Sequence, residues 1–401
     1  MKPLPLPLPV TAARHQSGFT LVELLVSLAL GLAVLVGLSS VYVAAKQSFR
    51  FQETSGRLQE DAVFALEMIS RDLRMAGYAG CRGVDSATIS SVLTYFPNLA
   101  LATAPTAITG ANPLAAVYPT VAMVTMQPLS PVNFVRGFDN VPSAMFASGA
   151  VPASGTTDSL FFSGGSANAV SLTTAMVSTS DNLTIGADPF GWGTGANTYT
   201  MVVSDCVNSS LFAGKLAVGN TQIDHSTTMG NSANTFPSNP LYGIDAQVMP
   251  LEWSFYYVAT RSGASTPSLY RVFYNGTTRG NAEELVSNIE TMKLNYGENI
   301  NGKDTVTNLQ CTIATGGATC APTFQADVWR TTAAAVTDWS RVVAVRVGLM
   351  MLSADSAVNP DIASTPTLLG QSYTLPTGAS TTRLRKEFST TVVLRNRVAP
   401  R

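Results

Sequence analysis

The sequence predicts an α+β protein, in which one long N-terminal helix packs on an antiparallel, β-rich head. Three observations lead to this prediction. A long apolar run lies near the N-terminus, an amphipathic helical pattern follows it, and apolar residues alternate with period two in the C-terminal half. We therefore expect a helix over residues 19–77, with a membrane-spanning part at 24–45, and a head over residues 78–401.

The composition excludes several classes of protein. Only 12% of the 401 residues are charged, 46% are hydrophobic, and the formal net charge is −1. No segment combines dense Lys and Arg with aromatic residues, so we expect no nucleic-acid partner. The two histidines are His15 and His225, and a catalytic triad or a His-ligated metal in the head would depend on His225 alone. We therefore expect no enzyme activity, no metal and no cofactor.

The apolar run contains 22 uncharged residues, from Leu24 to Ala45. As a helix it is roughly 33 Å long, enough to cross the hydrocarbon core of a bilayer. A later apolar run, Val342 to Leu352, is shorter and contains Arg346. The sequence therefore predicts a single-pass membrane protein with everything after residue 45 on one side.

Helical periodicity continues beyond the apolar run. Apolar residues recur at three- and four-residue steps, and Gly77 is suited to end the helix. The predicted stripe consists of Phe51, Leu58, Ala62, Leu66, Ile69, Leu73 and Ala76, with Ser55 in its one gap. We expect this stripe to pack on the head.

Period-two alternation predicts the strands of the head. Gly, Ser, Thr and Asn separate the alternating segments, which favours antiparallel pairing. The predicted strand positions are Leu251/Trp253/Phe255/Tyr257, Tyr270/Val272/Tyr274, Met292/Leu294/Tyr296, Val343/Val345/Val347/Leu349 and Phe388/Thr390/Val392/Leu394.

The start of the apolar run carries a specific motif. Residues 17–32 read SGFTLVELLVSLALGL, and this resembles the processing site of type IV prepilins and related pseudopilins. The resemblance implies that a prepilin peptidase cuts between Gly18 and Phe19 and methylates the Phe19 amine. Residues 1–18 would then be a leader peptide.

Glu23 is the one charge within the apolar segment around it. A carboxylate near the bilayer centre costs about 2.5–3.5 kcal/mol on insertion scales, and such a residue usually has a partner. The resemblance implies that this partner is the methylated Phe19 amine of a neighbouring subunit. Snorkelling of Glu23 to the lipid headgroups is the simpler alternative.

Four further segments resemble PilW-type minor pilins: residues 71–81, 202–206, 338–352 and 386–397. This implies a subunit that joins other minor pilins and the major pilin on an inner-membrane assembly platform. It would prime pilus assembly and end near the fibre tip, beneath an adhesin. The alternatives are a J-type pseudopilin of type II secretion and a membrane-anchored envelope enzyme. Residues 86–150 and 207–245 carry no such match.

The four cysteines all follow the membrane span, so an oxidising compartment would allow two disulfides. We expect Cys311 to pair with Cys320 and Cys81 with Cys206. A zinc site is disfavoured because no CxxC pair is present. Residues 297–304, GENINGKD, offer oxygen ligands but are better explained as a hairpin turn than as a calcium loop. The aromatics Trp253, Tyr256 and Tyr257 are better explained as core than as a recognition patch.

Overall fold

The structure is a computed structural model of the chain. It describes residues 19–80, 93–95, 134–141, 150–152, 157–188, 190–191, 198–205, 209–217, 219, 221–229, 231, 234–236, 241–261, 263–276, 282–304, 310–312, 320–322, 325–354, 366–373, 375 and 383–397. For residues 93–95, 150–152, 302–304, 310–312 and 320–322 it describes the backbone alone.

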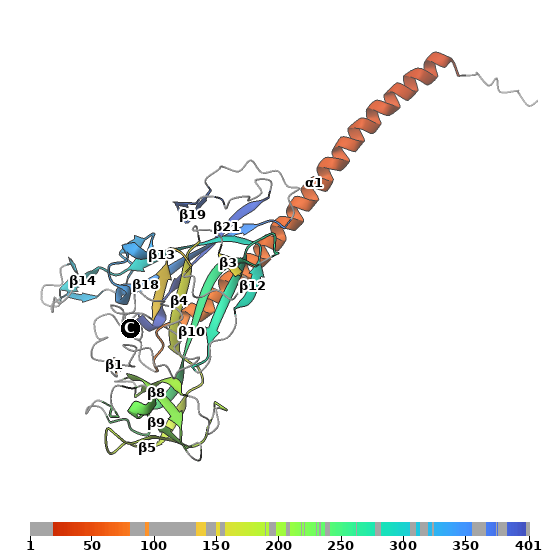
Figure 1. Cartoon of the computed structure of the whole chain (residues 1–401). Coiled ribbons are helices and arrows are strands. Elements are labelled where there is room, and N and C mark those ends of the chain that lie inside the picture. Colours follow the sequence, from red (N-terminus) through yellow and green to blue (C-terminus); the bar gives the residue numbers. More distant parts are fainter. Residues whose placement is uncertain are drawn as a thin grey trace, which may run out of the picture. The chain divides into compact units, whose positions relative to one another are not determined.

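The described part of the chain begins with one long helix, α1, over Leu21–Arg74 (Figure 1). The chain divides into two compact units, residues 1–55 and 56–401, so α1 contributes to both. After the helix, Gly77 adopts a φ of +73°, a conformation that glycine takes without steric strain. The predicted long helix is confirmed, but it ends at Arg74, three residues before Gly77.

Residues 56–74 of α1 bury one face in the head. Leu58, Ala62, Ile69 and Leu73 are each at most 4% exposed, as the periodicity predicts. Phe51 is the exception, because it is 44% exposed and the buried face begins only at Leu58. The predicted stripe is therefore correct from Leu58 onward and wrong at Phe51.

The described strands of the head form four sheets, mostly antiparallel, with one parallel pair between β1 and β8. The largest has the order β1-β8-β9-β6-β5-β10-β11-β12, with β2, β3, β4 and β7 attached off this path. Its strands are β1 Leu93–Tyr95, β2 Val135–Phe138, β3 Ala150–Pro152, β4 Ser159–Gly165, β5 Val170–Thr174, β6 Leu183–Ile185, β7 Tyr199–Ser204, β8 Ser209–Leu216, β9 Gln222–Asp224, β10 Gln247–Arg261, β11 Ser268–Tyr274 and β12 Glu283–Ser287.

A second sheet has the order β17-β13-β18-β21, and two smaller sheets follow the orders β15-β14-β16 and β19-β20. Their strands are β13 Ile289–Glu298, β14 Asn301–Asp304, β15 Gln310–Thr312, β16 Cys320–Pro322, β17 Val328–Arg330, β18 Val342–Leu352, β19 Thr367–Leu368, β20 Gln371–Ser372 and β21 Arg385–Val393. Short 3-10 helices lie at Thr227–Met229, Ala333–Ala335, Trp339–Arg341 and Arg395–Arg397.

The long strand β10 separates two hydrophobic clusters. Trp253, Phe255 and Tyr257 belong to one cluster, whereas Tyr256 and Val258 belong to the cluster that contains the buried face of α1. Successive side chains of a strand point to opposite faces, so both faces of β10 are covered. The aromatic residues of β10 are core, as expected, because all four are at most 1% exposed.

The alternation predicted for β18 is wrong at one position. Val345, Val347 and Leu349 join the cluster around α1, but Val342 joins it in place of Val343. The register with β13 shifts at this point: Gly297 pairs with Ala344, and Glu298 pairs with Val342. Val343 is thus the extra residue of a β-bulge, which changes the face to which the following side chains point.

In β21 the predicted alternation is confirmed, since Val392 and the following Leu394 are buried between exposed neighbours.

Candidate assembly site

The first turn of α1 carries the residues that the sequence singles out. Gly18 lies outside the described residues, and Phe19 directly follows it. The Thr20 side chain caps the helix, because its Oγ1 accepts a hydrogen bond from the Glu23 N–H at 3.3 Å. The Glu23 carboxylate lies in the first helical turn, where the helix dipole favours a negative charge.

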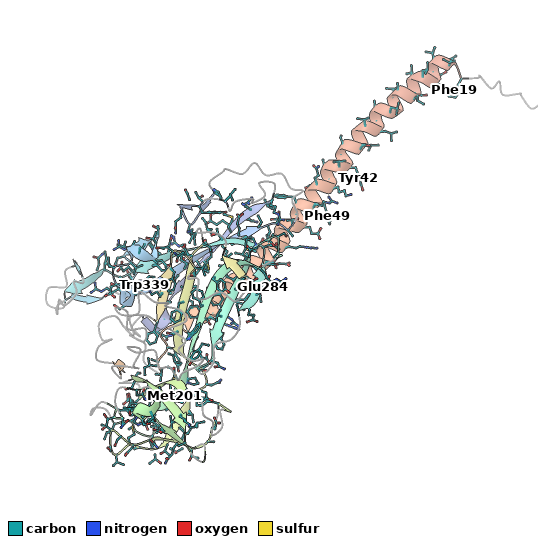
Figure 2. The ribbon with its side chains drawn as sticks, viewed as in Figure 1. Phe19, Tyr42, Phe49, Met201, Glu284 and Trp339 are labelled. Atoms are coloured by element: carbon teal, nitrogen blue, oxygen red, sulfur yellow. The ribbon has the colours of Figure 1, made fainter. Side chains whose placement is uncertain are left out.

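The surface around Glu23 is apolar and exposed. Phe19 is 80% exposed and Leu21 75%, and the apolar side chains continue along the helix through Tyr42 and Phe49 (Figure 2). Within this stretch the most apolar window has a mean hydropathy of 2.5, and none of it is buried. Such a surface is stable in lipid or against other apolar helices.

Two serine side chains of this stretch do not oppose burial in an apolar medium. Ser27 donates its hydroxyl hydrogen to the carbonyl oxygen of Leu24 at 2.9 Å, and Ser40 donates to that of Gly37 at 2.7 Å. Both hydroxyls are therefore satisfied by the helix itself. Glu23 makes no ion pair with any residue in the described part of the chain.

The segment GENINGKD does not form the expected hairpin. Residue 298 ends β13 and Asn301 begins β14, but β13 pairs with β17 and β18 whereas β14 pairs with β15 and β16. Glu298 is fully buried and holds Arg330 at 2.8 Å and the N–H of Asp338 at 2.8 Å. Its carboxylate is thus a structural anchor for the following loop, and the chain turns a corner between two sheets here.

His225, the histidine on which a catalytic or metal site in the head would depend, is buried. His225 is 1% exposed, lies against Phe236, and has its Nε2 2.8 Å from the carbonyl oxygen of Asp181. Among the described residues, no group of three or more His, Cys, Asp and Glu is arranged to hold a metal ion.

The disulfide predictions fall largely outside the described residues. Cys81 and Cys206 are not described, and only the backbones of Cys311 and Cys320 are, in β15 and β16. These two strands lie on opposite sides of β14, so two strand spacings of about 4.8 Å separate them. Two cysteines that form a disulfide usually have Cα atoms closer together than two strand spacings, so this strand pairing does not support the Cys311–Cys320 bridge. Both pairings stay predictions.

Comparison with known families adds to this geometry. Residues 13–39 match the prokaryotic N-terminal methylation motif, which spans Gly18, Phe19 and Glu23. Residues 255–396 match the family described as type IV pilus-assembly protein W. The two matches support a type IV pilus-related pilin. The methylation motif and the exposed apolar helix fit a membrane-anchored pilin.

The second match supports part of the sequence resemblance. It contains the segments 338–352 and 386–396, whereas 71–81 and 202–206 lie outside both matches. The matched region runs from within β10 to the 3-10 helix after β21, and it includes the whole sheet around β13 and β18. Neither a curated protein nor a solved structure matches the chain.

Sequence reasoning missed the buried ion pairs of the head. Arg385 contacts Glu290 through two bonds, Nε to Oε2 at 2.6 Å and Nη2 to Oε1 at 2.7 Å. Lys293 lies 2.9 Å from Asp158, whose pKa burial raises to about 6. The partners are 95 and 135 residues apart, so helical or strand periodicity carries no signal for them.

Proposed function

We propose that the chain is a minor pilin, a non-enzymatic subunit that helps to initiate type IV pilus assembly and is incorporated into the fibre. The observation that carries this proposal is the match to the methylation motif at the start of an exposed apolar helix whose first turn holds Glu23. The match to the assembly protein W family favours the pilus over a secretion system.

In the proposed mechanism, a prepilin peptidase removes residues 1–18 and methylates the new N-terminal amine of Phe19. The amine keeps its positive charge, and it meets Glu23 of a neighbouring subunit as the apolar helices pack side by side. Pairing removes the penalty of an unpaired carboxylate in an apolar medium, which is about 2.5–3.5 kcal/mol at a bilayer centre.

The proposed partners are other minor pilins, the major pilin, the inner-membrane assembly platform and an adhesin at the tip. Before assembly, the chain would span the inner membrane once, through residues 24–45, with its head in the periplasm. The head would then be exposed at the cell surface as part of the fibre. This oxidising route allows the two proposed disulfides, Cys81 with Cys206 and Cys311 with Cys320. The second also requires the Cα atoms of Cys311 and Cys320 to come closer than two strand spacings.

Processing gives the first test. Co-expression with a prepilin peptidase should shorten the chain by 18 residues and leave a methylated Phe19, as measured by intact mass and N-terminal peptide analysis. A Gly18→Val chain is the matched control and should stay uncut, because a branched side chain replaces the small residue at the cleavage position. An uncut wild-type chain, or a cut after Ala45, would contradict the proposal.

Deletion of the gene gives the second test. Cells without the chain should carry fewer surface pili, and sheared pili from the complemented strain should contain the chain in small amounts. If secretion of folded exoproteins fails instead while pili form normally, the chain is a pseudopilin of type II secretion. A chain that remains entirely in the membrane fraction would argue against incorporation.

A further inference from the structure

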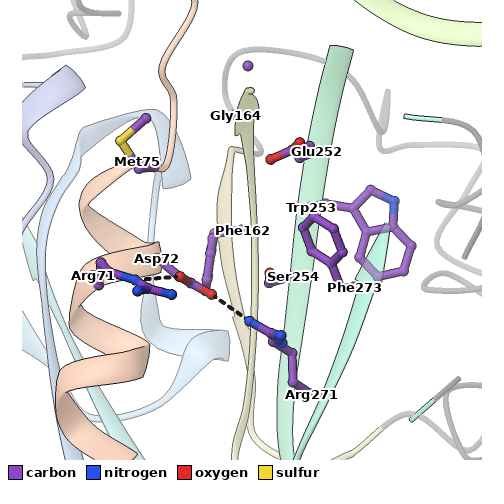
Figure 3. Close-up of a pocket in the computed structure, with 11 residues that line it drawn as sticks. Arg71, Asp72, Met75, Phe162, Gly164, Glu252, Trp253, Ser254, Arg271 and Phe273 are labelled. Atoms are coloured by element: carbon purple, nitrogen blue, oxygen red, sulfur yellow. Dashed lines mark hydrogen bonds and ion pairs between the residues drawn. The ribbon is translucent and has the colours of Figure 1, made fainter. Parts of the chain in front are cut away.

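A pocket of about 280 Å³ opens beside the C-terminal end of α1 (Figure 3). Asp72 of α1 borders one side, and Glu252 and Ser254 of β10 lie on the strand that faces it. Phe162 of β4 and Phe273 of β11 complete the walls. All of these residues belong to the same compact unit.

The pocket exists because the segment that follows α1 no longer covers β10. Tyr256 of β10 donates its hydroxyl hydrogen to Asp72 Oδ2 at 2.7 Å, so the helix still covers β10 there. The helix ends at Arg74, and the chain crosses β4 instead, where the Gly77 N–H donates to the carbonyl oxygen of Ser163 at 2.8 Å. Ser254 and Glu252, which share the face of Tyr256, are left facing the pocket.

The sheet register shapes the pocket as a slot. Phe162 and Phe273 both pair with Ser254, one from each neighbouring strand, so a small side chain lies between two aromatic ones. The Cα atoms of the two phenylalanines are about 9.6 Å apart, since two strand spacings separate them. At the next position, Glu252 pairs with Gly164, which contributes no side chain. The slot is therefore apolar along its sides and ends at a carboxylate.

The arginines that line the pocket form their ion pairs with carboxylates other than Glu252. The two arginines of the pocket, Arg71 and Arg271, approach Asp72 at 3.7 and 3.4 Å, and Arg271 also contacts Glu283 at 3.0 Å. No lysine or arginine of the described residues forms an ion pair with Glu252. Burial raises the pKa of Glu252, the hydrogen bond with Ser166 lowers it, and the Asp72 charge raises it.

We propose that this pocket binds the side chain of a lysine or arginine from another protein. The methylene groups would lie between Phe162 and Phe273, and the charged end would reach Glu252. Long cationic side chains bury their stems on apolar surfaces, aromatic faces attract cations, and a hydrogen bond between two charged groups is strong. A free diamine fits less well, because its second charge would lie toward Arg271 at the other end of the slot.

Model compounds test the proposal on the full chain in lipid nanodiscs. N-acetyl-arginine amide should bind at least about fivefold more tightly than N-acetyl-citrulline amide, its neutral isostere, in a ligand-observed NMR titration. Glu252→Gln should remove this difference because it removes the charge and keeps the shape. Glu60→Gln, which changes an exposed carboxylate on α1 outside the pocket, should leave the difference unchanged.

Filling the slot provides an independent variant. Ser254→Leu keeps Glu252 but occupies the space between the two phenylalanines, so binding of the arginine compound should be lost while the melting temperature stays within a few degrees. Three results would overturn the proposal: equal binding of the arginine and citrulline compounds, unchanged preference in Glu252→Gln, or tighter binding of putrescine than of the arginine compound.

Discussion

Glu23 and Glu290 are both carboxylates with apolar neighbours, but they differ in exposure and in their partners. Glu290 is 2% exposed, and its oxygens bind Arg385 at 2.6 and 2.7 Å and the Tyr373 hydroxyl at 2.9 Å. Glu23, on the first turn of α1, is exposed and has no ion-pair partner in the described part of the chain. Among the described residues, Glu290 has a cationic partner and Glu23 has none.

The other buried acids of the head follow the pattern of Glu290. Asp158 binds Lys293 at 2.9 Å, and Glu298 binds Arg330 at 2.8 Å. A charge removed from water is tolerated when a cation and hydrogen bonds surround it. The head supplies these groups internally, whereas in our proposal another subunit supplies the cation for Glu23.

The largest expected effect on head stability comes from breaking the buried pair. Arg385→Met should lower the free energy of unfolding by about 3–5 kcal/mol, because Glu290 would keep its charge without its cation. Urea unfolding followed by tryptophan fluorescence measures this change. The double variant Glu290→Gln/Arg385→Met should recover part of the loss, and a double variant as unstable as the sum of the two single variants would show that the pair is not coupled.

The next effect contrasts the two faces of α1 within the head. Ile69→Ala should lower the free energy of unfolding by about 2–5 kcal/mol, since Ile69 is fully buried and its loss leaves a cavity. Phe64→Ala is the matched control on the exposed face, where Phe64 is 56% exposed, and it should change stability by about 0.5 kcal/mol or less. Equal losses in the two variants would mean that both faces of the helix are covered.

A smaller effect depends on pH. Burial raises the pKa of Asp158 from 3.8 to about 6, so the folded state binds this proton more tightly than the unfolded state. The free energy of unfolding should therefore decrease by roughly 2–3 kcal/mol as pH rises from about 4 to 6, and it should level off above that range. Asp158→Asn should lack this step. Parallel pH profiles in the two proteins would show that Asp158 titrates at its ordinary pKa.

The sequence predicted the elements whose signals are local. The apolar run, the stripe from Leu58 to Ala76 and the alternation of β10 each depend on residues within a few positions of one another. The same holds for the methylation motif around Gly18 and Phe19, which the family match supports.

The remaining features depend on pairing between distant segments. The bulge at Val343 depends on the register with β13, and the Glu290–Arg385 pair joins strands far apart in the chain. The pocket beside α1 needs Phe162 and Phe273 in register with Ser254. No periodicity within one segment specifies such pairings, so they could not be read from the sequence.

Glu23→Ala should have the smallest effect on the head, with no measurable change in its free energy of unfolding. Glu23 lies in the unit of residues 1–55 and makes no ion pair or side-chain hydrogen bond with described residues of the head. Removal of the charge also makes the helix more apolar, so membrane insertion should be retained. A destabilised head would mean that Glu23 contributes to folding.

The same variant tests most directly whether the Glu23 carboxylate docks the subunit into the fibre. The measurement is the amount of the chain in sheared pili from cells that hold equal amounts of it in the membrane. Glu23→Ala should accumulate normally in the inner membrane but be nearly absent from pili, because the neighbouring Phe19 amine loses its counter-charge. Glu23→Asp, which keeps the charge with a shorter reach, should give an intermediate level. If Glu23→Ala entered pili as efficiently as the wild-type chain, the carboxylate would not mediate docking, and helix packing and head contacts alone would hold the subunit.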